Sequence, residues 1–571
     1  MIAQQELEQR PLESLSKRYR CNTLVTGAGL AEAGPSRHTA PLTHVPSRLK
    51  NGALVHPFRA VSSVGAVLTA LPLALGALVA PTVVTPPAAA AQGQVTLASP
   101  QVLPTPQIDG IVWDQAVVGN VVYVVGEFNN ARPFGAADGE NESPRYNAMA
   151  YDITTGALLD WAPKVNGKIS SVTASADGST IYLGGNFTSV NDETVYRVAA
   201  VDATGKRKPL GASANGAVMD LELSPDGSTL YLAGSFTQLN SSSRLRAGAV
   251  DLKTHRVTGF APQVDNYMVR SITVAADNSA VAIGGSFTSV GGSSDAYGLA
   301  VLEKDGSLRH TNIAGVVRNA GRDSGIMSVK SDSRGLYAVA YSQEGAFEGM
   351  FRASWTTGDI DLMADCHGDT YDVLPTNDVI YIASHTHDCS NIGGFADGEE
   401  DGKYHHAVGF SSTATGTVQR NKVWGYTDFE GQPAPTQYNG FLPGFANGSY
   451  SGMNQAVWTV EGNGQYIVYG GEFVAVNGIH QQGLVRFSAS GGDANDQGGN
   501  DNNGNDNNGK DKKNKDKKDK KNKDKKNKKK NKKKHDDWDD QDGWDNQGGW
   551  DNQGGWDNQG GWDNWDDQDD E

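Results

Sequence analysis

The sequence predicts an all-β fold, a seven-bladed β-propeller closed by an N-terminal strand and flanked by disordered N- and C-terminal segments. Short runs of β-branched and aromatic residues are separated by Asp-Gly and Thr-Gly turns, which is typical of antiparallel strands. These runs recur as a repeat along most of the chain, and the last repeat lacks a fourth strand. No segment between the runs has a helical period, which argues against a parallel sheet with helical crossovers.

The repeat is clearest over residues 167–210, where three apolar runs and a weaker fourth run predict a four-stranded meander. The second strand carries the signature Tyr-x-x-Gly-x-Phe, or a weakened form of it, at residues 123–128, 182–187, 231–236, 281–287 and 468–473. Two further strands, 336–342 and 380–386, keep the apolar pattern without the Gly-x-Phe, so the repeats number seven. One such sheet cannot bury both apolar faces alone, and radial packing of the copies is therefore expected.

The first strands give the same number of repeats and locate an insertion. The apolar residues that close them are Ala116, Val172, Leu221, Ile272, Val329, Val373 and Val457. The long interval before the last of these places an insertion in the sixth repeat. The final repeat stops after its third strand, and we expect the segment around Val102 to pair with that strand at 484–487, which removes an open sheet edge.

The propeller is assigned to residues 98–490, and residues 1–91 are assigned to a disordered leader followed by a signal peptide. Basic residues precede an apolar run over 61–84, and an alanine cluster follows it, which predicts export with cleavage after Ala91. A leader that stays uncleaved as a membrane anchor is the alternative. Either way, the protein is expected to be secreted or associated with the cell envelope.

Three low-complexity segments follow the propeller. They are a Gly/Asn/Asp linker at 491–509, a Lys-rich segment at 510–535 and a Trp/Asp/Asn/Gln/Gly repeat tail at 536–571. None has the periodicity that a packed core requires, so all three are predicted to be disordered. The formal net charge of the chain is −17, and an acidic propeller disfavours nucleic acid as a native partner.

The cysteine content agrees with export. The chain has three cysteines, and Cys21 falls in the predicted leader. The remaining pair, Cys366 and Cys389, is even in number, and such a pair in an exported chain predicts a disulfide.

A propeller channel is lined by its innermost strands, and polar residues at equivalent positions there are candidates for a binding ring. The residues that precede the closing positions are Gln115, Ser171, Asp220, Ser271, Ser328, Asp372 and Ala456. Gln115, Asp220 and Asp372 are the candidate ring residues among them. The simpler interpretation is that they solvate a water-filled channel.

The sixth repeat carries a second candidate site. His367 and Asp369 open its first strand, and His385 and His387 replace the Gly-x-Phe on its second strand. The alternation of side chains places both histidines of a His-x-His on one face, a spacing that metal sites use. A disulfide-stapled structural corner, a bound metal ion and acid/base catalysis all remain open. No nucleophile elbow or carboxylate pair accompanies the cluster, so no catalytic residue is assigned and no cofactor is required.

The insertion in the sixth repeat is rich in aromatic residues. Trp424, Tyr426 and Tyr438 are candidates for stacking on a sugar or a peptide. A self-packed surface loop is the alternative.

The repeat motifs resemble a known bacterial family. Gly-Gly-x-Phe-x-x-Val, Arg-x-Ala-x-Val-Asp and Asp-Gly-Ser-x-x-Tyr-Leu-Gly-Gly are similar to the delta-sixty-type repeat of secreted actinobacterial β-propellers of uncharacterised function. The resemblance covers residues 100–487. It implies a propeller and export, and it implies no reaction.

These observations favour a monomeric binding or scaffold module at or near the cell envelope, retained non-covalently by its charged tail. The expected partners are an extracellular glycan, a wall polymer or a protein ligand. The alternative is an extracellular glycan-active hydrolase or lyase that uses the histidines of the sixth repeat, although an enzyme is the less favoured interpretation.

Overall fold

The computed structural model describes residues 95–343, 345–397 and 404–493. They belong to one compact unit that spans residues 89–571. The predicted leader and signal peptide at 1–91 lie outside the described residues, as do the predicted Lys-rich segment and repeat tail and all of the predicted linker beyond residue 493. Within the described ranges, no helix is long and apolar enough to cross a membrane.

The main sheets are antiparallel, and their strands follow chain order. The first sheet contains β3 (Ile111–Val118), β4 (Val121–Glu127) and β7 (Ala148–Asp152). The second contains β8 (Ile169–Ala174), β9 (Thr180–Gly185), β12 (Val198–Asp202) and β13 (Arg207–Lys208). The third contains β14 (Val218–Leu223), β15 (Thr229–Gly234), β18 (Ala247–Asp251) and β19 (Arg256–Val257). The fourth contains β20 (Val269–Val274), β21 (Val281–Gly285), β22 (Leu299–Leu302) and β23 (Leu308–Arg309).

The remaining main sheets include the one that carries the insertion. A short helix α1 (Ile313–Val316) precedes β24 (Ser324–Asp332), β25 (Gly335–Ser342), β26 (Gly349–Ala353) and β27 (Ile360–Asp365). The next sheet contains β28 (Thr370–Pro375), β29 (Val379–Thr386), β30 (His405–Ser411) and β33 (Gln437–Tyr438). The last contains β35 (Val457–Gly462), β36 (Tyr466–Gly471) and β39 (Leu484–Ser488).

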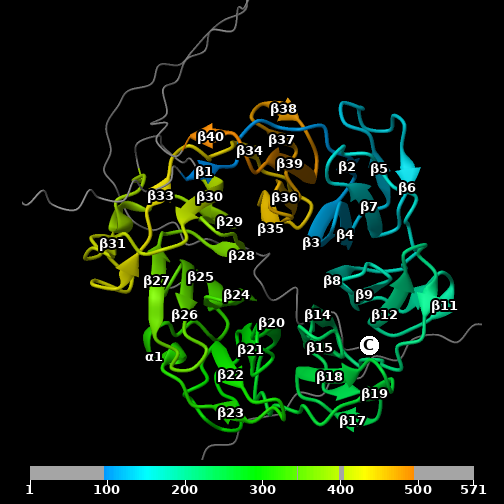
Figure 1. Ribbon diagram of the computed structural model, residues 1–571, viewed down its shortest axis with the longest axis horizontal. Coiled ribbons are helices and arrows are strands. Elements are labelled where there is room, and N and C mark those ends of the chain that lie inside the picture. The colour runs from blue at the N-terminus through cyan, green and yellow to red at the C-terminus, as the bar shows by residue number, and fades with distance from the viewer. Residues whose placement is uncertain (1–94, 344, 398–403, 494–571) are drawn as a thin grey trace, which may run out of the picture. The chain divides into compact units, whose positions relative to one another are not determined.

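The first strands of these sheets face a common centre (Figure 1). Each contacts the first strand of the next sheet, from β3 through β8, β14, β20, β24, β28 and β35, and β35 contacts β3 in turn. Sheets that radiate from a centre in this way form a β-propeller. The prediction of an all-β propeller is therefore confirmed, because packing of sheet on sheet buries the apolar faces that one sheet leaves exposed.

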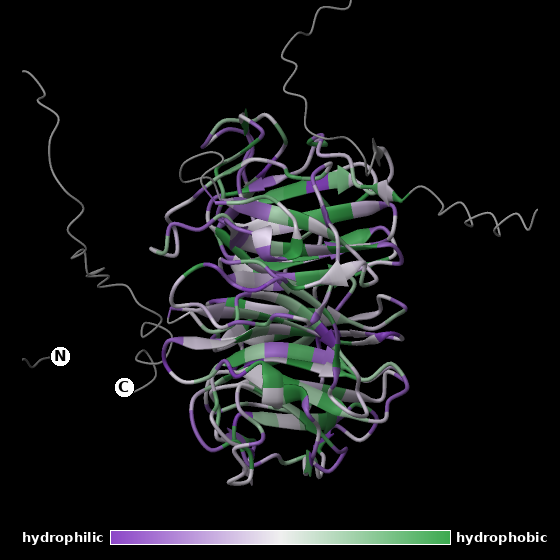
Figure 2. Ribbon diagram, turned by 90° about the vertical axis from the view of Figure 1, so that its left-hand side faces the viewer, coloured by the Kyte–Doolittle hydropathy of each residue, from purple (hydrophilic) through white to green (hydrophobic). Residues whose placement is uncertain are grey.

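The second-strand signature packs one sheet against the next. Phe187, Phe236 and Phe287 are fully buried between sheets. A Cβ added to Gly184 would lie 2.7 Å from a Val218 side-chain carbon of the next sheet, so glycine allows the close approach. Figure 2 shows the result, with strands that are largely hydrophobic and hydrophilic segments concentrated in the loops.

Every first strand contains a β-bulge at the equivalent place. The register shifts by one residue within β3, β8, β14, β20, β24, β28 and β35. The bulged residues are Trp113, Ser170, Met219, Arg270, Met327, Tyr371 and Trp458, and all of them line a central cavity. A bulge re-aims a side chain and interrupts the hydrogen-bond ladder beside it.

The two ends of the described chain meet on the last sheet. Leu103 forms an antiparallel bridge with Arg486, and β1 (Thr96–Leu97) pairs with β40 (Gly492–Asp493). The Arg486 guanidinium donates to the carbonyl oxygens of Pro104 and Ile153. Strand pairing thus extends beyond the predicted propeller limits at 98 and 490.

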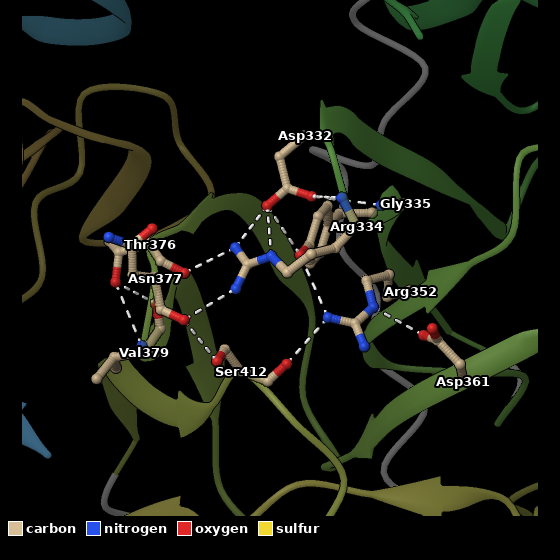
Figure 3. Close-up of polar contacts among 10 residues, drawn as sticks. Asp332, Arg334, Gly335, Arg352, Asp361, Thr376, Asn377, Val379 and Ser412 are labelled. Carbon is tan, nitrogen blue, oxygen red and sulfur yellow. Dashed lines mark hydrogen bonds and ion pairs between the residues drawn. The ribbon is translucent and has the colours of Figure 1, made fainter. Parts of the chain in front are cut away.

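Two arginines join neighbouring sheets next to the insertion (Figure 3). Arg334, at the turn between β24 and β25, donates to Asp332 at 2.8 Å and to the carbonyl of Asn377 at 3.1 Å in the following sheet. Arg352 on β26 donates to the carbonyl of Ser412 at 2.9 Å. Both arginines therefore tie the fifth sheet to turn carbonyls of the sixth.

Candidate functional site

The first strands enclose a cavity of about 320 Å³ at the centre of the sheets. Successive positions along these strands place three rows of side chains around it. The bulge row consists of the bulged residues named above. The staple row, one residue further, is Asp114, Ser171, Asp220, Ser271, Ser328, Asp372 and Thr459. The inner row, two residues beyond the staple row, is Ala116, Thr173, Glu222, Thr273, Lys330 and Glu461.

The carboxylates of the staple row each accept a backbone N–H from another sheet. Asp114 Oδ2 accepts from Val172 at 2.8 Å, and Asp220 Oδ2 accepts from Ile272 at 2.8 Å. The donating residue lies two residues after the bulge of its own strand, and because that strand is the edge of its sheet, its N–H has no partner in the ladder. A buried N–H needs an acceptor, so the carboxylate both satisfies the strand and joins two sheets.

Asp372 follows the same pattern, whereas Ser328 and Thr459 donate their hydroxyls to it. Asp372 Oδ2 accepts the N–H of Val460 at 3.0 Å. In two sheets a serine hydroxyl takes the place of the carboxylate as the acceptor. Ser171 Oγ accepts the N–H of Leu221, and Ser271 Oγ accepts that of Val329, both at 3.1 Å. Asp220 also accepts the hydroxyls of Ser171 and Ser271, so the row is linked side chain to side chain.

The predicted ring residues take different places in this arrangement. Asp220 and Asp372 stand in the staple row as expected. Gln115 lies one residue beyond that row, and Asp114 holds the position equivalent to Asp220. In the last sheet the equivalent residue is Thr459 instead of Ala456. Gln115 still lines the cavity, where it is 2% exposed, and neither atom of its amide has a hydrogen-bond partner among the described residues.

Carboxylates dominate the charge of the inner row and its surroundings. Burial raises the pKa of Asp114 to about 8, although the positive charge of Lys330 opposes the shift. Burial and the charge of Asp220 raise the pKa of Glu222 to about 8. Burial works to lower the pKa of Lys330, but Asp372 and the other carboxylates raise it well above its ordinary value. Lys330 Nζ lies 2.6 Å from Glu461 Oε1.

The bulge row gives the cavity an aromatic end. The ring centroids of Trp113 and Trp458 are 5.1 Å apart, and those of Tyr371 and Trp458 are 4.6 Å apart. Lys168 Nζ lies 4.1 Å from the Trp113 ring centroid. Trp458 is 5% exposed, and its indole Nε1 has no hydrogen-bond partner within the described ranges.

Tyr371 connects this cavity to the histidines of the sixth repeat. Its hydroxyl lies 2.8 Å from His385 Nδ1, and Gln455 Oε1 lies 3.2 Å from the same nitrogen. His385 Nε2 is 3.9 Å from Asp369 Oδ2. His385 therefore lies between the cavity and the outer corner of the sheet.

The outer corner is built around the predicted disulfide, which the structure confirms between Cys366 and Cys389. His367 is buried and stacks on Tyr426 with ring centroids 3.9 Å apart. Its Nε2 lies 3.3 Å from the amide nitrogen of Asn391, which can only donate, so that Nε2 is unprotonated. Burial lowers the pKa of His367, which favours the neutral ring.

The four predicted corner residues, His367, Asp369, His385 and His387, do not converge on a single site. His385 lies near Asp369, whereas His367 and His387 have other partners. His387 Nδ1 lies 3.5 Å from Asp397 Oδ2, and its ring centroid is 6.2 Å from that of His367. In the part of the chain that the structure describes, no three His, Cys, Asp or Glu residues are grouped to hold a metal ion.

The predicted aromatic residues of the insertion also lie in different places and do not form one stacking surface. Tyr426 covers His367, whereas Trp424 is 98% exposed. Tyr438 pairs with Gly409 inside the sixth sheet and is not at the cavity.

Several site residues escaped the sequence analysis. Trp113, Trp458, Glu222, Lys330 and Glu461 line the cavity and were not predicted to do so. The signal for the charged residues was present, because each lies two residues after a staple residue and side chains alternate along a strand. The bulged tryptophans had no such signal, since an alternating pattern does not show a bulge.

Glu348 is another residue that the sequence analysis missed. Its Oε2 accepts the N–H of Gly368 at 2.6 Å, beside the disulfide corner. Burial, followed by the charge of Asp369, raises its pKa to about 8.

No protein-family model matches the chain, and a search of curated proteins found no match. Among solved structures, the computationally designed Ika8 protein is 13% identical and matches with a TM-score of 0.35 over 69% of this chain and 100% of its own. The WD40 β-propeller domain of Doa1 is 11% identical, with a TM-score of 0.33 over 69% of this chain and 96% of its own. The Cps50 (Swd1) β-propeller domain of Myceliophteria thermophila is 10% identical, with a TM-score of 0.37 over 68% and 99%.

Proposed function

We propose that this chain is an exported seven-bladed β-propeller that acts as a binding module at or near the cell envelope. The sheets that begin with β3, β8, β14, β20, β24, β28 and β35 are its blades. The bridge between Leu103 and Arg486 supports closure of the last blade by the N-terminal segment.

The observation that carries a binding function is the state of the cavity wall. Gln115 and Trp458 are at least nine-tenths buried, line the cavity, and have polar atoms without a partner among the described residues. Leaving a buried polar group unpaired costs roughly 1–3 kcal/mol. The unpaired atoms are themselves inaccessible, so a ligand recovers that free energy when the Gln115 amide and the Trp458 indole rotate toward the cavity.

The surface beside the aromatic end of the cavity supports the same function. Most of the exposed large apolar side chains lie in loops that precede a first strand or join a second strand to a third, and these loops share one end of the sheets. They are Phe134, Tyr146, Tyr196, Tyr267, Val316, Tyr404, Tyr450, Val474 and Ile479. We call this set the aromatic face. The opposite end carries polar turns, such as the one in which Asp226 accepts from Ser228.

Aromatic rings beside polar groups suit a sugar, which offers an apolar face and hydroxyl edges. An extracellular glycan or wall polymer is therefore the favoured ligand, with a protein ligand next. The Lys-rich segment at 510–535 and the tail at 536–571 would retain the protein non-covalently by charge.

Sedimentation with purified cell-wall fragments tests this function in the full chain. We expect the native chain to co-sediment and Trp458→Ala to lose most of that binding. Trp424→Ala is the matched control, because Trp424 is exposed and does not line the cavity. Trp458→Phe, which keeps the ring but not the indole N–H, should bind several-fold more weakly while remaining folded. Equal sedimentation of the native chain and both Trp458 variants would refute binding in the cavity.

A further inference from the structure

We infer that the central cavity takes a ligand with a protonated amine on a compact ring or chain, the amine lying against Glu222 and the body against Trp458. This inference rests on the proposed binding function and adds the chemical class of the ligand. It depends on the charge of the cavity wall, on one carboxylate that the fold does not use, and on unpaired groups at the aromatic end.

The cavity wall has more carboxylates than cations. Asp114, Asp220, Glu222, Asp372 and Glu461 line it, against Arg270 and Lys330. Lys330 already contacts Glu461 at 2.6 Å and lies 3.8 Å from Asp372 Oδ1. The wall therefore has an excess of negative charge, and a cationic ligand would neutralise part of it.

Glu222 is the carboxylate that the fold leaves available. The three aspartates each accept hydrogen bonds from neighbouring strands, and Glu461 accepts from Lys330. No hydrogen bond or ion pair joins the Glu222 carboxylate to any described residue. Its raised pKa of about 8 agrees with this position, because burial and the charge of Asp220 outweigh the opposing charge of Lys330. A bound ammonium would take the place of that proton.

The positions of the rows set the orientation of the ligand. Arg270 and the three aromatic residues belong to the bulge row, whereas Glu222 lies three residues along the strand from that row, about 10 Å away. An amine is repelled by Arg270 and attracted by Glu222, so the amine end should point away from the aromatic end. The ring or chain body then lies beside Trp458, where rotation of the indole and of the Gln115 amide would bring their unpaired groups to the ligand hydroxyls.

The size of the cavity limits the ligand. A volume of about 320 Å³ lies at the lower end of the range for small-molecule sites, about 300–1,000 Å³. It suits one sugar-sized ring or a short side group of a polymer, not an extended chain. An amino-substituted sugar unit fits these requirements and agrees with the proposed glycan ligand.

A matched pair of small probes tests the amine. Cyclohexylammonium and cyclohexanol have nearly the same shape, and an alkylammonium group keeps its proton to about pH 10. Titration calorimetry on the full chain should show binding of cyclohexylammonium at least about tenfold tighter than that of cyclohexanol, as expected for one charge-assisted hydrogen bond. Glu222→Gln should remove that preference. Glu140→Gln makes the same charge change at an exposed residue and should preserve it.

The pH dependence distinguishes Glu222 from general attraction by an acidic protein. Affinity for cyclohexylammonium should rise about tenfold between pH 6 and pH 9 in the native chain, because Glu222 ionises in that range. The rise should be smaller in Glu222→Gln, where Asp114, whose pKa is also raised to about 8, is the remaining cavity carboxyl that ionises in this range. Equal affinity for both probes, or an undiminished preference in Glu222→Gln, would overturn the inference. Calcium chloride that binds through Glu222 while cyclohexylammonium does not would also overturn it, in favour of a metal site.

The outcome is independent of the sedimentation experiment. Wall binding without probe discrimination would retain the proposed function and reject the amine. Probe discrimination without wall binding would retain the amine and reject the wall as the native partner.

Discussion

Asp220 and Glu222 lie two residues apart on β14 and face the same cavity, yet the fold uses only one of them. Asp220 accepts hydrogen bonds from the N–H groups of Leu221 and Ile272 and from two serine hydroxyls. Glu222 accepts none from any described residue. The difference follows from position, because Asp220, just after the bulge, reaches an N–H on the free edge of the first strand of the next sheet. A row of similar acids therefore divides into staples that join sheets and groups that remain available to a ligand.

The largest expected effect comes from removing the most heavily bonded staple. Asp220→Ala leaves the N–H of Ile272 and the hydroxyl of Ser271 without their acceptor inside the protein. We expect the free energy of unfolding to fall by about 3 kcal/mol, since each buried group left unpaired costs roughly 1–3 kcal/mol. Urea unfolding monitored by tryptophan fluorescence measures this loss.

Glu222→Ala is the matched control for that variant, because it removes a carboxylate from the same strand and cavity. Its free energy of unfolding should stay within about 0.5 kcal/mol of the native value, or rise, since the fold makes no bond to this group. An equal loss of unfolding free energy in Asp220→Ala and Glu222→Ala would mean that the staple row and the inner row stabilise the fold to the same extent.

An intermediate effect is expected from a serine staple. Ser271→Ala removes the acceptor for the N–H of Val329 and one donor to Asp220. The expected loss is about 1.5 kcal/mol, about half that of Asp220→Ala, because only one backbone N–H is orphaned. Differential scanning calorimetry of the two variants would contradict this order if Ser271→Ala were the less stable.

The smallest effect is a dependence of stability on pH. The pKa of Glu222 is raised to about 8 in the folded protein, so the folded state keeps this proton after the unfolded chain has released it. Its contribution to stability is present below pH 4.5 and is lost as the pH rises toward 8. Relative to the native chain, Glu222→Gln should therefore gain at least about 1 kcal/mol between pH 5 and pH 8, since one unit of pKa difference is worth up to about 1.4 kcal/mol. A parallel pH profile for the two proteins would contradict this sign.

The fold was predictable because its evidence is repeated and local. Tyr182 and Phe187 mark a second strand in one repeat, and equivalent residues mark it in the others. The disulfide was predictable from the even number of cysteines outside the leader. The sheet at the insertion was harder to assign, since its fourth strand β33 follows 25 residues after β30.

The cavity was only partly predictable, because the length of the turn between the first two strands differs among the sheets. The sequence placed Gln115 beside Asp220, whereas strand pairing gives that position to Asp114. The turn between β3 and β4 is shorter than the one between β8 and β9, so equal spacing along the chain does not give equal positions. In the last sheet, strand pairing likewise puts Thr459 in the row instead of Ala456.

The most direct test of the division between the rows is urea unfolding of the native chain, Ser271→Ala and Glu222→Gln, each with and without cyclohexylammonium. A ligand that binds only the folded state raises the unfolding midpoint. Ser271→Ala should unfold at lower urea yet gain the same increment from the probe as the native chain. Glu222→Gln should unfold at the native midpoint or above it, and it should gain nothing from the probe. The reverse result, a Glu222→Gln variant that is less stable but still stabilised by the probe, would contradict the account.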